Sequence, residues 1–432
     1  MERTFKTLAL AGLLAGPGLE THGAEAAPPP APSWNPFQET GDEGDHLTGD
    51  WGGWRTYLTD RGVHIQAGYI GEVFGNVMGG VERGTVYEGL AEVALELDLA
   101  KVIRWPGGTV RVSGLSTHGD SPSELAGDAL TASNIDAYDS FRLYEWWLQQ
   151  SLFADTLSVR LGALLADEEF TGTTGGGRLI NSAFGWPAFI SGNVVNTGPA
   201  FNVPALGLRL HWTPAPGWHL QGGLFDGDSF DSPAGDPAAH PHGTHFQLNA
   251  DQGMLALAEA GYAWNQSATN GALSGQLKVG AWFHTADFPD HSDPTRFHDH
   301  NFGAYIAIEQ QLWREAEDAG SQGLEFFFRV GGSPEDRSTF AFTLDTGLSY
   351  TGLIPGRDKD KTTIGFVHAE ISDQPGEFNA FSHYEQVLEV SYEFVLRPWW
   401  SVQPDLQWIH HPTGGQDVDD ALLLGLRTAI SF

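Results

Sequence analysis

The chain contains no cysteine, and its basic residues are scarce: 22 Lys and Arg stand against 55 Asp and Glu, giving a formal charge of −33 over 432 residues. The lack of cysteine excludes disulfide frameworks and thiolate metal sites. The shortage of basic residues argues against a nucleic-acid partner, because phosphate binding needs a basic stripe that displaces counterions. We therefore expect no nucleic acid as a partner, and nothing in the sequence calls for a cofactor.

Long apolar runs are also missing beyond the N-terminus. No uninterrupted stretch reaches the about 18 residues that a transmembrane helix needs. If the chain enters a membrane, it must do so as a closed β-barrel, the only sheet that leaves no unpaired backbone groups facing lipid. The 55 Gly, 15 Trp and 26 Phe suit such a barrel, although a soluble glycine-rich β-protein has a similar composition.

The N-terminus has the layout of a cleavable secretory signal. Two basic residues, the short apolar run 8–14 and small residues around Ala26 follow one another. This apolar core is shorter than the about 20 residues that span a bilayer. The region after it is rich in proline and acidic residues and cannot pack a core. We predict a signal peptide at 1–26, a periplasmic leader at 27–46 and a transmembrane barrel at 47–432.

From residue 63 onward, apolar and polar residues alternate in segments of about ten residues, as in strands that cross an outer membrane. At the C-terminus, Leu422, Leu424 and Leu426 share one face with Phe432. A soluble sandwich strand also alternates in this way. A chain that ends on Phe432 in this pattern nevertheless resembles the signal that the barrel assembly machinery reads.

Sixteen such segments occur, and an even number places both termini on the periplasmic side. The predicted strands are 63–74, 86–98, 108–118, 140–150, 156–167, 205–213, 217–227, 254–264, 273–286, 301–314, 322–333, 339–351, 362–373, 384–396, 400–411 and 420–432. Their connections alternate between short turns, such as 214–216, and long external loops, such as 168–204. We therefore predict an all-β fold, a transmembrane antiparallel β-barrel of about 16 strands.

Several motifs, in this order, resemble the OprB family of carbohydrate-selective porins. They include LTGDWGGWR at 47–55, WPGG at 105–108, RLG at 160–162, NSAF at 181–184, EQQL at 309–312, GLIPGRD at 352–358 and PDLQWI at 404–409. Each motif is weak alone, but together they extend over residues 47–432. The resemblance implies a monomeric or homotrimeric pore in the bacterial outer membrane, in contact with lipid and lipopolysaccharide, that admits glucose and other small sugars. The short leader, the histidine-rich loops and the acidic excess depart from the family pattern and leave the favoured sugar open.

A sugar filter needs polar groups that replace hydration and flat aromatic faces for the C–H surface of the sugar, and it must release what it binds. Arginine suits this task because its planar fork can bridge two vicinal hydroxyls. By strand parity, the predicted pore-lining residues are Glu92, Arg111, Arg160, Glu309, Arg329, Glu385, Glu389, Asp405 and Arg427. For each of them the alternative is a charge that pairs with its neighbours and stiffens the barrel wall.

The segment 168–204 is too long for a simple connection, and loops of this length are usually functional or disordered. Its glycine run at 175–177 and its Phe184–Pro187 stretch fit a loop that folds inward and narrows the pore. Trp186 would then offer an aromatic platform to the sugar. The alternative is that Trp186 packs the loop against the barrel wall.

Two other functions are alternatives to a sugar porin. An outer-membrane enzyme would need a catalytic motif, and neither a Gly-x-Ser-x-Gly elbow nor a His-Glu-x-x-His pair occurs. A general or cation-preferring diffusion porin remains open because the chain is so acidic. Histidines and aspartates at 240–245 and 290–300 could bind a divalent cation, but solvated side chains on external loops are the simpler interpretation, so we predict no metal site.

Overall fold

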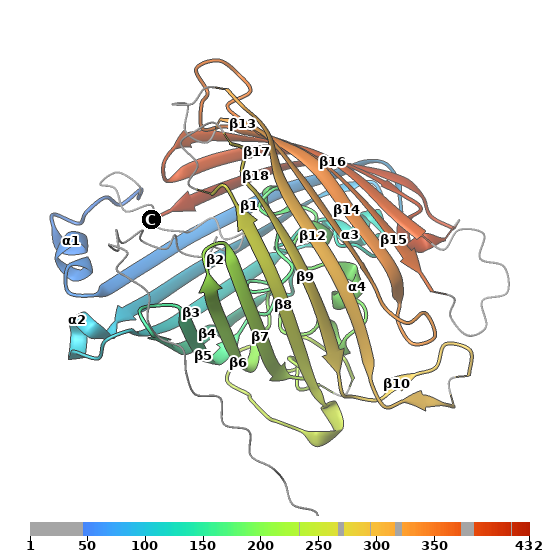
Figure 1. Ribbon diagram of the computed structural model, residues 1–432. Coiled ribbons are helices and arrows are strands. Elements are labelled where there is room, and N and C mark those ends of the chain that lie inside the picture. Colours follow the sequence, from blue (N-terminus) through green and yellow to red (C-terminus); the bar gives the residue numbers. More distant parts are fainter. Residues whose placement is uncertain are drawn as a thin grey trace, which may run out of the picture. The chain divides into compact units, whose positions relative to one another are not determined.

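The structure is a computed structural model. It describes residues 46–232, 234–266, 272–293, 295–315, 322–372, 384–415 and 417–432. The predicted signal peptide and nearly all of the predicted leader lie outside the described residues. The rest is dominated by sixteen antiparallel strands that close into a barrel (Figure 1), with the first strand paired to the last. The predicted fold class is therefore confirmed.

All sixteen predicted strands are present, with some boundaries moved by a few residues. They are β1 (Val63–Gly80), β2 (Gly84–Asp98), β3 (Gly108–Gly119), β4 (Ser140–Leu152), β5 (Leu157–Leu164), β6 (Ala205–Ala215), β7 (Trp218–Asp226), β8 (Met254–Trp264), β9 (Gly275–His284), β12 (Asn301–Arg314), β13 (Gly323–Gly332), β14 (Phe340–Thr351), β15 (Lys361–Ile371), β16 (Tyr384–Arg397), β17 (Trp400–His410) and β18 (Asp419–Ser431). A small hairpin of β10 (Phe288–Pro289) and β11 (Phe297–His298) lies in the connection between β9 and β12.

The helices are short and lie in the connections. They are α1 (Trp54–Thr59), α2 (Leu99–Ile103), α3 (Pro122–Ala126) and α4 (Ala188–Ser191). The hydroxyl of Ser121 caps α3 by accepting the Ser123 N–H, and Gly127 ends it in the left-handed conformation that glycine adopts without strain. Within the described ranges, no helix is both long and apolar enough to span a bilayer.

The two ends of the barrel differ in the connections they carry. At one end, here called the turn end, lie the short connections 153–156, 216–217 and 398–399. At the other end, here called the loop end, lie the long connections 120–139, 165–204, 227–253 and 285–300. β1 begins and β18 ends at the turn end, so the barrel starts and finishes on the same side, as the even strand number predicts.

The outward face of the barrel is an apolar band with aromatic residues at the turn end. Side chains such as Val93, Leu161 and Leu426 are half or more exposed. Large rings at the turn end are exposed as well, namely Trp105, Trp212, Trp218, Trp313 and Trp400. This arrangement is that of a membrane barrel, in which apolar side chains face lipid and aromatic rings mark the interface with water.

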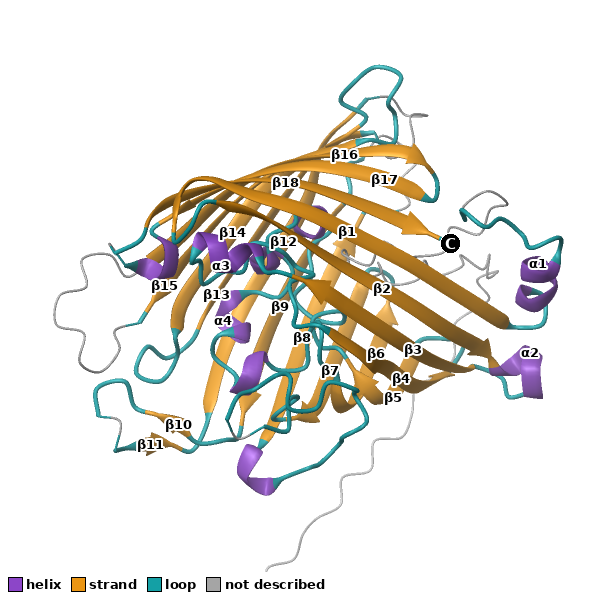
Figure 2. Ribbon diagram, turned by 180° about the vertical axis from the view of Figure 1, so that it is seen from behind, coloured by secondary structure: helices purple, strands orange, loops and turns teal. Residues whose placement is uncertain are grey.

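Two of the loop-end connections turn back against the inward face of the barrel (Figure 2). One is 120–139, which contains α3, and the other is 165–204, which contains α4 and is here called the inner segment. The ring of Phe184 in the inner segment packs 6.2 Å from that of Phe327 on β13, and the ring of Phe189 lies 5.8 Å from that of Tyr305 on β12. The hydrophobic core therefore lies between the wall and these connections.

Candidate functional site

Arg329 on β13 is the most deeply buried anchor of the inner segment. Its side chain is fully buried, and strand register places it opposite Asp345 of β14, whose carboxylate accepts a 2.7 Å hydrogen bond from Nε. The remaining guanidinium nitrogens donate to backbone carbonyls of the inner segment, those of Thr171, Ala183, Phe184 and Gly185, at 2.8–3.3 Å. The guanidinium thus satisfies carbonyls that the short 3₁₀ turn at 182–184 leaves unpaired.

Carboxylates on β16 hold the same connections through backbone amides. Glu389 accepts the N–H groups of Ile180 and Asn181 at 2.5 and 3.0 Å. Four residues earlier on the same face, Glu385 accepts those of Ala129 and Leu130 at 2.8 and 2.9 Å. Both carboxylates are fully buried. A buried carboxylate is tolerated where several N–H groups satisfy it, so these contacts fix the loops to the wall.

Two arginines face each other directly across β5 and β6. Arg160 and Arg209 are register partners, an arrangement that would be repulsive on its own. Glu169 of the inner segment lies between them, with its two oxygens 2.7 Å from Arg160 Nη1 and 3.0 Å from Arg209 Nε. Burial opposes the ionisation of Glu169, but the two guanidiniums outweigh it and hold the pKa of this carboxyl below its usual value.

A second cluster of paired charges lies on β2, β3 and β4. Arg111 reaches Glu92 at 3.0 Å and Glu145 at 3.3 Å. At the seam where the barrel closes, register places Arg427 of β18 opposite Glu72 of β1, and the two side chains are ion-paired. The inward wall therefore carries arginine–carboxylate groups on widely separated strands.

The predicted strand residues all lie on the inward face, opposite the exposed apolar residues, but their surroundings differ. Arg329, Glu385 and Glu389 are covered by the connections that they hold, and Asp405 is 5 % exposed beside Gln407. Arg160 keeps 19 % of its side chain exposed, and Arg427 keeps 12 %. The remaining three are Glu92, Arg111 and Glu309; Glu92 and Arg111 are ion-paired, and Glu309 accepts the Thr174 N–H at 2.5 Å.

Trp186 is 7 % exposed, and its indole N–H donates to the Thr197 carbonyl at 2.9 Å. It shares a hydrophobic cluster with Phe189 of the inner segment and with Trp147 of β4. These contacts correspond to the alternative in which Trp186 packs the loop against the wall. The aromatic ring that meets a charged inward group is Trp147, since the Arg160 guanidinium lies 4.0 Å from its ring centre.

Several residues at these contacts are absent from the pore-lining residues predicted from the sequence. Arg209 could have been found, since it alternates with Leu208 and Leu210 as Arg160 does with its neighbours. Glu169 and Arg178 carry no such signal because they lie in an irregular segment. Arg178 pairs with Glu325 of β13 at 3.1 Å, a contact that depends on how the inner segment crosses the barrel.

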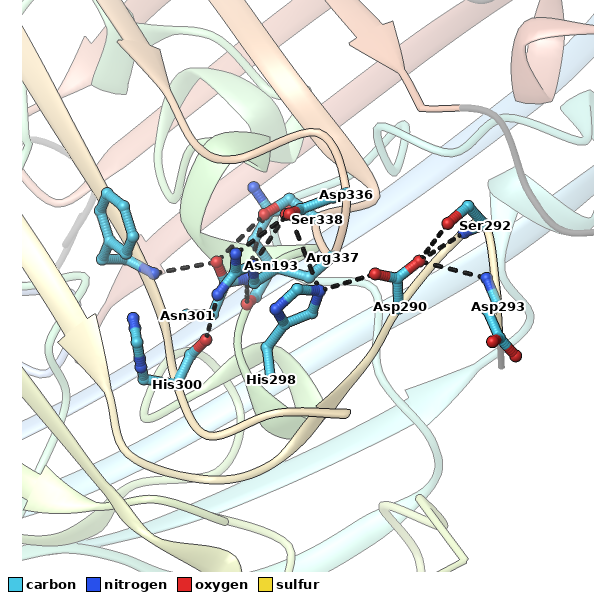
Figure 3. A network of polar contacts seen from close by, with 11 residues as sticks. Asn193, Asp290, Ser292, Asp293, His298, His300, Asn301, Asp336, Arg337 and Ser338 are labelled. Atoms are coloured by element: carbon cyan, nitrogen blue, oxygen red, sulfur yellow. Dashed lines mark hydrogen bonds and ion pairs between the residues drawn. The ribbon is translucent and has the colours of Figure 1, made fainter. Parts of the chain in front are cut away.

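The histidine-rich external connection 285–300 forms a polar network (Figure 3). His298 Nε2 lies 3.0 Å from an oxygen of Asp290, whose other oxygen accepts the hydroxyl and N–H of Ser292 at 2.6 and 2.8 Å. The Ser292 bonds hold the pKa of Asp290 well below its usual value. Arg337 pairs with Asp336 at 2.8 Å beside this hairpin. Across the described ranges, no three His, Cys, Asp or Glu side chains are placed to hold a metal ion.

The model of the carbohydrate-selective porin family, OprB, matches residues 82–432. The chain belongs to this family. Its sequence is 24% identical to Porin B of Pseudomonas aeruginosa, in an alignment that covers 100% of this chain and 98% of the relative. It is 23% identical to the putative porin QuiX of Acinetobacter baylyi, over 89% of this chain and 93% of that one.

The fold agrees with this assignment. The high-pH structure of Pseudomonas putida OprB matches with a TM-score of 0.78 and 22% identity, over 91% of this porin and 100% of that chain. The outer membrane channel DcaP of Acinetobacter baumannii matches with a TM-score of 0.51 and 11% identity, over 86% and 97% of the two chains. The protein is thus a carbohydrate-selective porin of the bacterial outer membrane, and its family comprises porins rather than enzymes.

Proposed function

We propose that this porin passes small neutral sugars of the glucose class by facilitated diffusion, and that they are selected where the inner segment faces the barrel wall. The observation that carries the proposal is the set of inward arginines that lie beside carboxylates: Arg160 and Arg209 share Glu169, and Arg111 lies between Glu92 and Glu145, which gives three arginines and three carboxylates. Paired charges offer many hydrogen-bond donors and acceptors with little net charge. Such a wall can replace the hydration of a neutral sugar without retaining it strongly.

The groups that keep part of their surface exposed are the best candidates for sugar contact. Arg178 and Glu325 form an ion pair with 16% and 36% of their side chains exposed. Together with Arg160 beside Trp147, this pair supplies both elements that a sugar filter needs, a planar donor fork and an aromatic surface. Arg329, Glu385 and Glu389 would instead act by holding the inner segment in place.

A cation-preferring diffusion porin is the second candidate, favoured by the formal charge of −33. Liposome swelling separates the two. We expect glucose and arabinose to enter faster than sucrose, and faster than a charged solute of similar size. Equal entry of all these solutes would contradict sugar selectivity, and preferential entry of a cationic solute would favour the alternative.

We further propose how the chain matures and assembles in the outer membrane. Residues 1–26 would be removed as a signal peptide, 27–46 would remain as a periplasmic leader, and 47–432 would form the barrel, as a monomer or a homotrimer surrounded by lipid and lipopolysaccharide. Phe432 would be the element that the barrel assembly machinery reads. Its carbonyl accepts a 2.8 Å hydrogen bond from Arg55, which fixes the chain end beside β1. Deleting Phe432 should lower the yield of folded barrel on unheated gels, and a normal yield would refute this role.

A further inference from the structure

Two histidines lie on the inward face of the barrel wall between the arginine pair of β5 and β6 and the turn end. His211 on β6 is the register partner of Ser158 and lies two residues nearer the turn end than Arg209. His219 is the second residue of β7, beside the turn at 216–217. The residues that flank both histidines along their strands are exposed on the outward face. A solute that enters at the loop end therefore reaches the arginines first and the two histidines afterwards.

The ring nitrogens of His211 are unpaired and accessible. Within the described ranges, neither nitrogen has a hydrogen-bond partner, and neither is among the buried unpaired atoms, which do include Nδ1 of His291 and Nδ1 of His411. Because the side chain points inward, both nitrogens of His211 can be reached from the lumen. A neutral imidazole offers one donor and one acceptor, which are the groups that bond to a hydroxyl.

His219 offers a flat ring surface next to His211. Its register partner on β8 is Gly261, and a Cβ atom at Gly261 would lie 1.9–2.7 Å from three atoms of the imidazole ring. One face of the ring therefore lies against the β8 backbone, and the other face is directed away from the wall. Nε2 lies 3.4 Å from Oε1 of Glu259, and 15% of the His219 side chain is exposed. The two imidazole rings are 5.9 Å apart and within 16° of parallel.

The charged groups beside the two histidines are already occupied by protein partners. Arg209 pairs with Glu169 at 3.0 Å, and Glu259 accepts the Tyr305 hydroxyl at 2.8 Å and the Thr171 N–H at 3.1 Å. The accessible groups that remain are a flat ring face and polar ring nitrogens. A neutral sugar needs this combination, because its C–H surface packs on a flat face while its hydroxyls exchange water for hydrogen bonds.

We propose that His211 and His219 form a second sugar subsite, on the turn-end side of the arginine pair, for a neutral hexose that leaves the passage. His211 bonds to the hydroxyls through its ring nitrogens, and the free face of His219 packs against the C–H surface. Two weak contacts allow release, which a channel requires. This inference rests on the proposed function, since the subsite lies on the same sugar path.

Single-channel recordings with glucose added to one side of the membrane test the subsite. The loop end of each channel is identified by streptavidin and a biotin on Leu248→Cys, because the chain has no other cysteine and Leu248 is 65% exposed on the external connection 227–253. We expect His211→Ala to slow glucose association from the turn end about fivefold, as the loss of about one hydrogen bond requires, and association from the loop end less than about twofold. A purely structural role would change both rates alike.

Substitutions to phenylalanine separate the two contacts. His211→Phe keeps a ring without the nitrogens and should be as slow as His211→Ala. His219→Phe keeps the flat face and should stay near the wild type, whereas His219→Ala should be slow. The matched control is His118→Ala, which changes an exposed histidine on the outward face of β3 and should leave both rates as in the wild type.

Folded barrel on unheated gels is the control for assembly of each variant. Wild-type rates from both ends in His211→Ala would overturn this inference and leave the proposed function standing. Equal slowing from both ends would overturn it in favour of a structural role for His211. A wild-type channel whose current glucose interrupts from neither end would contradict the proposed function, and the subsite with it.

Discussion

The inner segment and the external hairpin β10–β11 are both held by charged side chains, but the bonds differ in kind. Arg329 is fully buried and donates to backbone carbonyls distant in sequence. Arg337, beside the hairpin, pairs with its own neighbour Asp336, which is 49% exposed, and donates to a single distant carbonyl, that of His300, at 3.2 Å. A buried charge that is fully hydrogen-bonded fixes one conformation, whereas an exposed pair contributes little to stability. We infer that the dimensions of the pore depend on the first kind of contact.

The largest effect is expected from Arg329→Leu. This change leaves Asp345 buried without its partner and frees the carbonyls of the inner segment, at a cost of about 3–5 kcal/mol in the free energy of unfolding. We expect a clearly lower unfolding midpoint and a higher single-channel conductance. The matched control is Arg337→Leu beside the hairpin, which removes an ion pair with exposed Asp336 and one bond to the His300 carbonyl. It should lower the midpoint much less than Arg329→Leu and leave the conductance unchanged. Equal changes in midpoint and conductance for Arg329→Leu and Arg337→Leu would contradict the claim that only the inner segment depends on a buried charge.

A pH titration of channel conductance tests Glu169. Its pKa is lowered in the folded protein, so its contribution to stability is fully present above the unfolded value, about 4.3, and is lost as the pH falls from there through the lower folded value. We therefore expect the conductance of the wild type to rise only once the pH reaches the folded pKa of Glu169, below about 4.3, where Arg160 and Arg209 lose the carboxylate between them. Glu169→Gln should be more conductive at neutral pH and should lack that part of the acid response.

Asp290→Asn is the control for this titration, because the pKa of Asp290 is also lowered but its carboxylate bonds to Ser292, Asp293 and His298 of the external connection. We expect its acid response to match that of the wild type. An unchanged acid response in Glu169→Gln would show that the bridge between Arg160 and Arg209 does not hold the inner segment.

A smaller effect is expected from Glu389→Gln. The amide keeps one oxygen for the Ile180 N–H but turns an NH₂ group toward the Asn181 N–H, and the loss should be about 1–3 kcal/mol in the free energy of unfolding. Glu393→Gln on the same strand is the control, since Glu393 is 25% exposed and its one ion pair within the described ranges is with Lys361. Urea unfolding of the two variants should differ, and a match between them would contradict the anchoring role of Glu389.

The smallest effect is expected from His298→Ala in the hairpin. His298 is 20% exposed, and Asp290 keeps its bonds to Ser292 when the histidine is removed, so the loss should lower the unfolding midpoint slightly and leave the conductance unchanged. A large rise in conductance would show that the hairpin also restricts the pore.

The barrel could be predicted from the sequence because most strands carry their own alternation; β4 is an exception, since Tyr144 and Glu145 are adjacent and both buried. Arg160 and Arg329 could be assigned to the inward face on parity alone. Their partners could not, because Glu169 and the carbonyls of 183–185 belong to an irregular segment whose path is set by tertiary contacts. For the same reason, sequence parity could not distinguish the covered Glu389 from the partly exposed Arg160.

The most direct test of the account is the size limit for sugar entry in liposomes that contain either the wild type or Arg329→Leu, both shown to be folded on unheated gels. The account predicts that the wild type admits glucose much faster than sucrose and that the variant narrows this difference. An unchanged ratio of glucose to sucrose entry in the variant would contradict the claim that the inner segment, held by Arg329, sets the passage.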